Sequence, residues 1–106
     1  MTSALDKSVG EVFKALHEKN MLENSIIAFS TDNGGAVQGM DKSSGSNWPL
    51  RGSKYNMWEG GIRGVAFIWS QLFPDTKEAI SKNLMHISDW LPTLYAAAGN
   101  FEQINR

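Results

Sequence analysis

The stretch NWPLRGSKYNMWEGGIRG, from Asn47 to Gly64, decides the fold of this chain together with STDNGG, from Ser30 to Gly35. Both stretches are rich in glycine, and the longer one carries Lys54 among its tryptophans and glycines. They belong to one connection, residues 34–64, in which the sequence shows no strong regular element. A connection of this length inside a compact domain is usually functional, or else its elements are misassigned. We therefore expect a binding or catalytic loop, with a short helix near Ser53–Trp58.

Two apolar segments frame this loop. Residues 25–30 and 64–70 are apolar almost throughout rather than alternating, which is typical of strands buried on both faces. Residues 3–19 place apolar side chains at helical spacing, and residues 89–98 begin with Asp89, a favoured helix cap. The order helix, buried strand, long loop, buried strand predicts an α/β fold with a mostly parallel sheet.

The composition sets limits on size and function. With 106 residues, of which 42% are hydrophobic, the chain has at most one domain with a modest core. Its 10 basic and 11 acidic residues give a net charge of −1, which favours neither nucleic acid nor an anionic membrane as a partner. The absence of cysteine excludes disulfides and thiolate metal sites. No apolar run reaches the length of a membrane span, and the first residues lack the features of a signal peptide.

Asp32 and Asn33 are the candidate metal ligands. They follow the first predicted strand directly, and in open α/β sheets the carboxyl ends of the strands open onto the binding crevice. A carboxylate beside an amide oxygen suits Ca²⁺ or Mg²⁺, although two ligands cannot fill the roughly six to eight positions around Ca²⁺. The other interpretation is a turn, because Asp-Asn-Gly-Gly is also a favourable turn sequence.

Lys54 is the candidate catalytic residue. A lysine ammonium group binds a tetrahedral anion and offsets charge on a leaving group, whereas the other interpretation is a solvated loop lysine. We expect Arg51 to tie the loop to a carboxylate such as Glu59. For His86 we expect a capping or packing role rather than acid–base chemistry. Trp48 is the tryptophan that we place near a substrate.

Taken in order, these segments resemble the sulfatase family, and most closely its arylsulfatase B branch. The motifs NWPLRGSKYNMWEGG and HISDWLPTL carry the match, together with residues 1–16 and 25–35. The resemblance covers most of the chain but only a central part of a full-length sulfatase, so it implies that residues 1–106 are a partial sulfatase domain. It also implies an alkaline-phosphatase-like α/β fold, incomplete here, with helices flanking a mostly parallel sheet. The implied activity is hydrolysis of sulfate esters with one divalent cation, usually Ca²⁺.

The resemblance assigns roles to single residues. Asp32 and Asn33 match the second pair of metal ligands in the family, an acid and an amide, and Lys54 matches the lysine that contacts the substrate sulfate. Arg51 and Glu59 match positions around that lysine to which we assign no chemistry. The family nucleophile is a formylglycine made from Cys or Ser in a C/S-x-P-x-R motif. It has no counterpart here, because the chain has no cysteine and no proline with a serine two residues before it. The N-terminal pair of metal-binding aspartates is missing too.

We interpret the chain as a fragment of an arylsulfatase-like hydrolase that carries metal-binding and sulfate-binding residues and is inactive alone. The implied partner is a sulfated small molecule or a sulfated glycan, and the implied compartment is the lysosome or the cell exterior. One alternative is a phosphatase or phosphodiesterase of the alkaline phosphatase superfamily, because a metal ion and a lysine serve phosphate as well as sulfate. The other is a non-catalytic truncated product that binds a partner.

Overall fold

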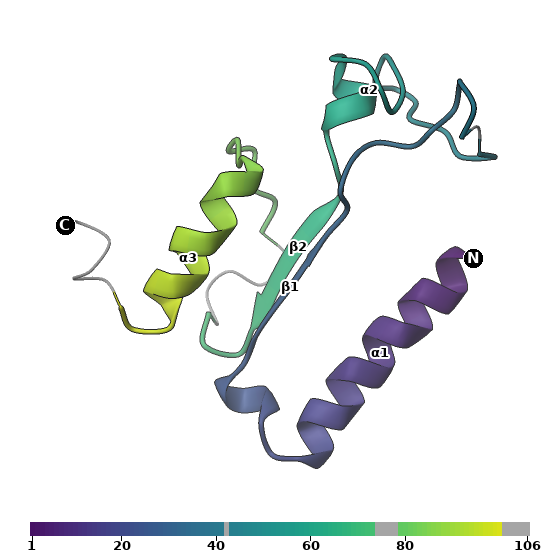
Figure 1. Cartoon of the computed structure of the whole chain (residues 1–106). Coiled ribbons are helices and arrows are strands. Elements are labelled where there is room, and N and C mark those ends of the chain that lie inside the picture. Colours follow the sequence, from purple (N-terminus) through teal and green to yellow (C-terminus); the bar gives the residue numbers. More distant parts are fainter. Residues whose placement is uncertain (42, 74–78, 101–106) are drawn as a thin grey trace.

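Two helices flank a two-stranded sheet in the computed structural model, which describes residues 1–41, 43–73 and 79–100 (Figure 1). Both predicted strands and both predicted long helices are present, with small shifts in their bounds. The elements in chain order are α1 (Thr2–Glu18), the 3₁₀ turn η1 (Leu22–Asn24), β1 (Ile26–Ser30), α2 (Glu59–Ile62), β2 (Ala66–Ser70), the 3₁₀ turn η3 (Ile87–Asp89) and α3 (Trp90–Ala97).

The two strands pair antiparallel, with Ser30 opposite Ala66. The expectation of a parallel sheet is therefore wrong for this pair of strands. A parallel pair needs a connection that crosses back to the start of the first strand, and residues 31–65 do not cross back. Instead they return at the end where β1 stops. There the Thr31 amide donates to the Val65 carbonyl, and the Val65 amide donates to the Thr31 hydroxyl, both at 2.9 Å.

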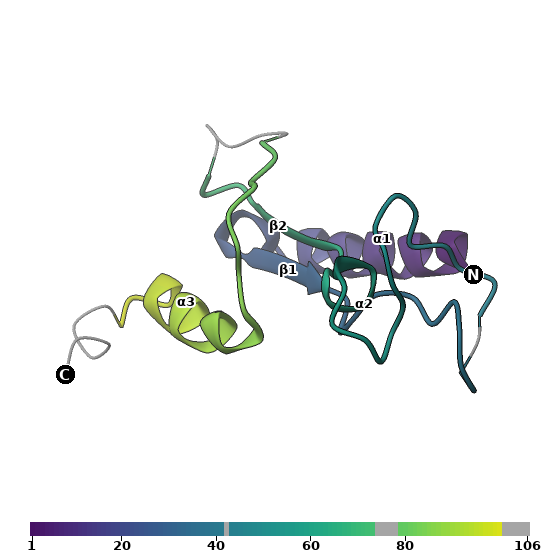
Figure 2. The same cartoon turned by 90° about the horizontal axis from the view of Figure 1, so that it is seen from above.

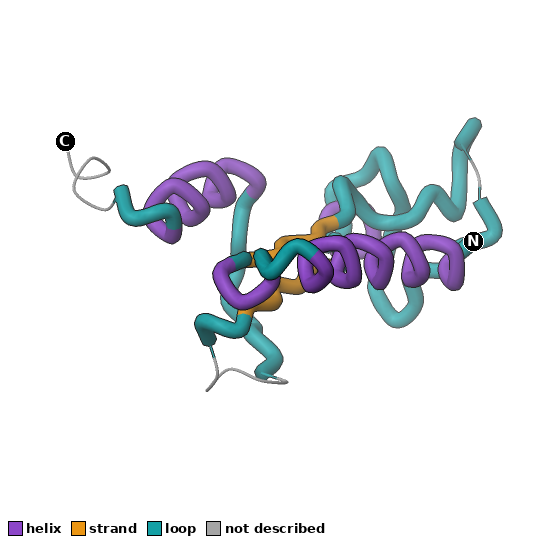
Figure 3. Tube along the Cα trace, turned by 90° about the horizontal axis from the view of Figure 1, so that it is seen from below, coloured by secondary structure: helices purple, strands orange, loops and turns teal. Residues whose placement is uncertain are grey.

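α1 packs on the sheet through part of its predicted apolar stripe. Val9, Phe13 and Leu16 are half-buried, while the rest of the helix is exposed. The Phe13 ring meets the Trp69 ring of β2 edge to face, with 4.7 Å between the ring centres. Such aromatic pairs add about 0.5–1.5 kcal/mol to the burial of their surface. Figure 3 shows the C-terminal half of α1 over the strands, while its N-terminal half extends beyond them.

The ends of both long helices follow from residues that the sequence contains at those points. Asn20 follows α1 with a left-handed φ of 54°, and Gly99 follows α3 with a φ of 91°. After α1, the Met21 amide donates to the Leu16 carbonyl at 2.9 Å, and the Asn20 amide donates to the His17 carbonyl at 3.0 Å. This pair of bonds satisfies carbonyls that the helix itself leaves without partners.

The start of α3 is a reciprocal cap. His86 Nδ1 accepts a hydrogen bond from the Ser88 amide at 3.3 Å, and the Asp89 carboxylate accepts one from the His86 amide at 2.7 Å. The capping role predicted for His86 is confirmed. Asp89 is also a capping residue, but its carboxylate satisfies an amide upstream of η3 rather than one inside α3.

The strands are more exposed than the sequence predicts. No hydrophobic side chain of the described residues is buried, and Phe67 and Ile68 in β2 are 39% and 49% exposed. The expectation of strands buried on both faces is wrong here, because two short strands and two helices are too few elements to cover both faces of a sheet. Figure 2 shows α3 on the side of the sheet away from α1. Within the described ranges, no helix has both the length and the apolarity of a membrane span.

The exposed strands lead to a prediction about stability. We expect the isolated chain to be marginally stable or to self-associate, because exposed apolar strands with unpaired edges promote association. Circular dichroism during heating, together with size-exclusion chromatography, measures both properties. A monomer with a cooperative transition at high temperature would contradict the prediction and would mean that these residues form a complete domain.

Candidate functional site

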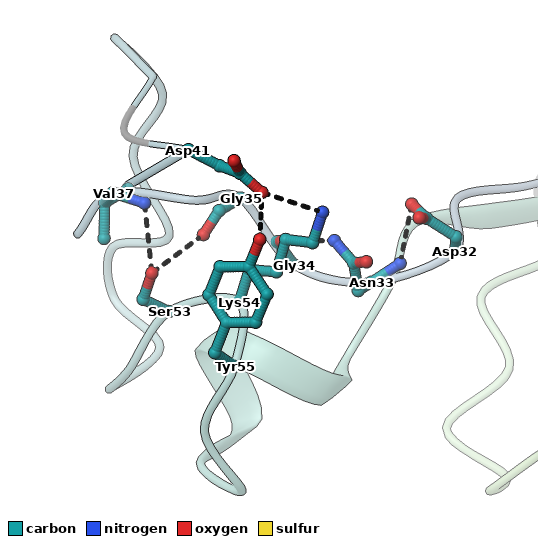
Figure 4. A network of polar contacts seen from close by, with 9 residues as sticks. All are labelled: Asp32, Asn33, Gly34, Gly35, Val37, Asp41, Ser53, Lys54 and Tyr55. Atoms are coloured by element: carbon teal, nitrogen blue, oxygen red, sulfur yellow. Dashed lines mark hydrogen bonds and ion pairs between the residues drawn. The ribbon is translucent and has the colours of Figure 1, made fainter. Parts of the chain in front are cut away.

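Asp32 and Asn33 leave β1 at the end where the loop begins. Asp32 is exposed, and one of its oxygens, Oδ1, accepts a hydrogen bond from the Asn33 amide at 3.0 Å. The Asn33 side-chain amide donates to the Gly34 carbonyl at 2.7 Å, as Figure 4 shows. Among the described residues, no hydrogen bond engages the second oxygen of Asp32 or the side-chain oxygen of Asn33, and no cation pairs with Asp32. Both side chains therefore have an oxygen available for a cation.

Gly34 brings the end of β1 against α2. It is buried, and its amide donates to the Gly61 carbonyl at 2.9 Å. A Cβ atom at position 34 would lie 1.9 Å from the Gly60 carbonyl oxygen, which no side chain tolerates. The glycines that make this sequence look like a turn are thus needed for close backbone packing between two parts of the loop.

The backbone at Lys54 is attached to the segment that carries Asp32 and Asn33. The Lys54 amide donates to the Gly35 carbonyl at 3.1 Å. Ser53, which is only 1% exposed, donates its hydroxyl to the same carbonyl at 3.3 Å and accepts from the Val37 amide at 3.1 Å (Figure 4). The loop therefore places the base of the Lys54 side chain within one hydrogen bond of the residue that follows Asp32-Asn33-Gly34.

Asn47 joins the same two segments from the side. Its Oδ1 accepts from the Gly35 amide at 2.8 Å, and its Nδ2 donates to the Gly35 carbonyl at 2.9 Å and to the Gly52 carbonyl at 3.0 Å. Gly52 has a φ of 101°, a conformation that favours glycine. We did not predict the roles of Asn47 and Ser53, because hydrogen bonds to backbone atoms far along the chain have no local sequence pattern.

The charged residues around Lys54 are arranged differently from the prediction. Arg51 does not bind Glu59; its guanidinium lies over the Trp58 ring, 3.8 Å from the ring centre. Glu59 instead pairs with Arg63, at 3.6 Å, because Arg63 follows α2 directly and lies one helical turn after Glu59. The predicted short helix is also displaced, since α2 begins at Glu59 and turns precede it. Trp48, in the same loop, is 87% exposed.

The Lys54 side chain has two partners that we did not predict. Its Nζ lies 3.7 Å from Asp41 Oδ2, and its side chain is 33% exposed. The Tyr55 hydroxyl donates a hydrogen bond to the same Asp41 oxygen. That hydrogen bond lowers the pKa of Asp41, against a smaller opposing effect of burial, and the charge of Lys54 lowers it further. The same hydrogen bond raises the pKa of Tyr55.

The remaining surroundings of Asp32 do not complete a metal site. In the part of the chain that the structure describes, no group of three or more His, Cys, Asp or Glu side chains is placed to hold a metal ion. Asp32 does border a cleft of about 390 Å³ between the end of β1 and α3, in which Phe29, Trp90 and Leu94 supply apolar walls. The chain thus presents two side chains with hard oxygen atoms and one lysine, joined through Gly35.

Comparison with known proteins identifies the family. The model of the family described as "Sulfatase" matches residues 1–100. Mouse arylsulfatase J is 48% identical over 98 residues, which are 92% of this chain and 16% of that protein. Human N-acetylgalactosamine-6-sulfatase is 32% identical over 97 residues, 90% of this chain and 18% of that protein. Human arylsulfatase A is 33% identical over 97 residues, with the same two shares.

The matches cover nearly all of this chain but only a small part of each relative. The chain spans 16% to 18% of the length of the curated relatives it matches. No solved structure matches it significantly. A family model that accounts for residues 1–100 and relatives that are all sulfatases leave one assignment: this chain belongs to the sulfatase family.

Proposed function

We propose that this chain is the metal-binding and sulfate-binding part of a domain that hydrolyses sulfate esters. One observation carries the proposal: the Lys54 amide is hydrogen-bonded to the Gly35 carbonyl at 3.1 Å. This bond attaches the candidate sulfate-binding residue to the segment that carries the candidate metal ligands, Asp32 and Asn33. A cation and a lysine on one anchored loop are the groups that an anionic ester requires for binding and for charge stabilisation.

The residues present fit a partial site for a divalent cation. Asp32 offers a carboxylate oxygen and Asn33 a side-chain oxygen, both hard ligands of the kind that Ca²⁺ prefers. Ca²⁺ binds about six to eight oxygens, so we propose that other parts of the domain and the substrate complete its coordination. When bound, the cation would polarise the oxygens of the sulfate group.

Lys54 would hold the sulfate group and balance negative charge. Its ammonium group donates to a sulfate oxygen, and it stabilises charge that develops as the ester bond breaks. The nucleophile, a formylglycine in the family that the sequence resembles, is not among these 106 residues, which contain no cysteine. We therefore assign to this chain the electrostatic half of the site, and the covalent half to another part of the domain.

Further proposals follow from the resemblance. We propose that β1 and β2 belong to a larger, mostly parallel sheet in the intact domain, whose other elements cover the apolar faces that are exposed here. The substrates would be sulfated small molecules or sulfated glycans, and the compartment would be the lysosome or the cell exterior. The arylsulfatase B branch, suggested by the order of the sequence motifs, remains the branch that we propose.

The direct test uses a hybrid domain, in which this chain replaces the matching segment of mouse arylsulfatase J. We expect Lys54→Ala in the hybrid domain to lower kcat for a chromogenic aryl sulfate by about 100- to 1,000-fold, as for other groups that stabilise a transition state. Its Ca²⁺ affinity should stay nearly unchanged, because the partner of Lys54 is the sulfate group. Steady-state kinetics and calorimetric Ca²⁺ titration measure the two effects.

Lys19→Ala is the matched control for this test. Lys19 lies at the end of α1, where it forms no ion pair within the described residues, and its removal should change neither kcat nor Ca²⁺ affinity. If Lys54→Ala kept full turnover, or if it lost the metal, the role assigned to Lys54 would be wrong.

A further inference from the structure

Lys54 already has an anionic partner inside this chain. Asp41 Oδ2 lies 3.7 Å from Lys54 Nζ and also accepts the hydrogen bond from the Tyr55 hydroxyl (Figure 4). Lys54 Nζ lies 5.2 Å from the centre of the Tyr55 ring. A carboxylate therefore stands beside the cation to which the proposed function assigns the sulfate group of the substrate.

This ion pair differs from the others in the described residues. The other three pairs join residues four apart in the sequence, within a helix or at its end, and their side chains are 61% to 79% exposed. The Lys54 side chain is only 33% exposed, and its partner comes from a distant part of the loop. The Asp41 side chain is 55% exposed, so both partners of this pair are less exposed than those of the other three pairs, and solvent screens their interaction less.

Tyr55 holds the Asp41 carboxylate in this position. Its hydrogen bond lowers the pKa of Asp41 and raises the pKa of Tyr55, so both groups keep the protonation states that they ordinarily have at neutral pH, a charged carboxylate and a protonated hydroxyl. The Tyr55 backbone has a φ of 80°, in the left-handed region that costs a non-glycine residue about 1–2 kcal/mol. Ser53, buried just before, and the Lys54 amide bond to Gly35 fix the backbone that leads into this conformation.

We propose that Asp41 is a specificity-determining residue, which makes the Lys54 site favour singly charged sulfate esters over doubly charged phosphate esters. The inference rests on the proposed role of Lys54 in binding the substrate anion. A sulfate monoester carries one negative charge at neutral pH. A phosphate monoester, with a second pKa near 6, carries close to two. The Asp41 carboxylate repels each of these charges, so the repulsion is about twice as large for the phosphate ester.

Methyl sulfate and methyl phosphate are the probes that isolate this effect, because they have similar shapes and differ by one charge at pH 8. Their dissociation constants are measured by NMR titration of the ¹⁵N-labelled 106-residue chain at constant low ionic strength, following the amides of Lys54 and Tyr55. We expect Asp41→Asn to tighten methyl phosphate about four- to ten-fold and methyl sulfate about two- to three-fold. Tyr55→Phe, which only releases the carboxylate, should give a smaller change in the same direction.

The controls separate the charge of Asp41 from other effects. Asn at position 41 keeps an acceptor for the Tyr55 hydroxyl, so Asp41→Asn removes the charge with little change of shape. Glu23→Gln removes one charge from η1, at the opposite end of β1, and should tighten neither ester selectively. Equal tightening of both esters by Asp41→Asn, or the same selective change with Glu23→Gln, would overturn the inference.

Lys54→Gln separates the inference from the proposed function. If Lys54→Gln leaves the affinity for both esters unchanged, Lys54 does not bind the anion and the proposed function fails with the inference. If Lys54→Gln abolishes binding but Asp41→Asn leaves the ratio of the two affinities unchanged, only the inference fails. A second measurement uses the hybrid domain, where Asp41→Asn should strengthen competitive inhibition by methyl phosphate more than inhibition by methyl sulfate. An unchanged inhibition ratio there overturns the inference even if the isolated chain does not hold its loop.

Discussion

The isolated 106-residue chain is expected to hydrolyse no sulfate ester above background, even with excess Ca²⁺. The chain has no cysteine, and none of its prolines has a serine two residues before it, so the nucleophile motif of the family is missing. Loss of a catalytic nucleophile typically costs about six orders of magnitude in kcat. The roles that we propose for Asp32, Asn33 and Lys54 are binding and polarisation of the substrate, and none of the three supplies the covalent step.

A chromogenic aryl sulfate, purified chain and saturating Ca²⁺ are sufficient for this measurement, with the hybrid domain as the active reference. Lys54→Ala in the isolated chain identifies any contaminating sulfatase, because a contaminant is unaffected by that substitution. Turnover by the isolated chain that disappears with Lys54→Ala would show that the chemistry resides in these residues, contrary to our assignment.

In the hybrid domain, Asp32→Ala is expected to weaken Ca²⁺ binding by more than about 100-fold. Removal of a residue that merely orients a metal ligand costs about 10- to 100-fold in affinity, and Asp32 is proposed as a ligand itself. Its loss removes the negative charge as well as the oxygen, and Ca²⁺ affinity depends strongly on the number of charged ligands. Turnover should fall with the metal and should not recover at attainable Ca²⁺ concentrations.

Asn33→Ala provides the graded comparison for Asp32→Ala, because it removes a neutral oxygen from the adjacent position. We expect a smaller loss of Ca²⁺ affinity and partial recovery of turnover at high Ca²⁺. Calorimetric titration of both variants beside the unchanged hybrid domain gives the affinities. Retention of full Ca²⁺ affinity by Asp32→Ala would remove Asp32 from the metal site, whatever the effect on turnover. The isolated chain itself should bind Ca²⁺ only weakly, since two side chains leave most of the coordination to water.

Much of the secondary structure could be predicted from the sequence, because its signals are local. The apolar stripe of α1, the apolar runs of β1 and β2, and the glycine after α3 each lie within a few residues of the feature they determine. The direction of strand pairing is not local. The same apolar runs suit parallel and antiparallel partners, and the course of the connection between them decides which forms.

The candidate site likewise has features that the sequence predicts and features that it does not. The residue types mark Asp32, Asn33 and Lys54 as candidates, and the resemblance to a family gives each of them an expected role. The contacts of Asn47 with Gly35 and of Asp41 with Lys54 were not predictable, because each joins residues more than ten positions apart, and the sequence carries no pattern for such pairs. Arg51 is the clearest example of a contact that the sequence does not determine. A guanidinium can pair with a carboxylate or with an aromatic ring, and in the folded chain it lies over the Trp58 ring.

The bonds between Thr31 and Val65, which close the loop at its base, have an evolutionary consequence. Once the two ends of the loop are joined, lengthening the chain between them costs little free energy. Doubling a flexible connection costs only about 0.6 kcal/mol of closure entropy. We therefore expect insertions and deletions between Gly35 and Asn47 to be tolerated as long as both residues keep their mutual hydrogen bonds. In the site that we propose, selection can alter the segment that carries Asp41 without displacing Asp32, Asn33 or Lys54. Divergence in substrate among members of the family need not disturb the strands at all.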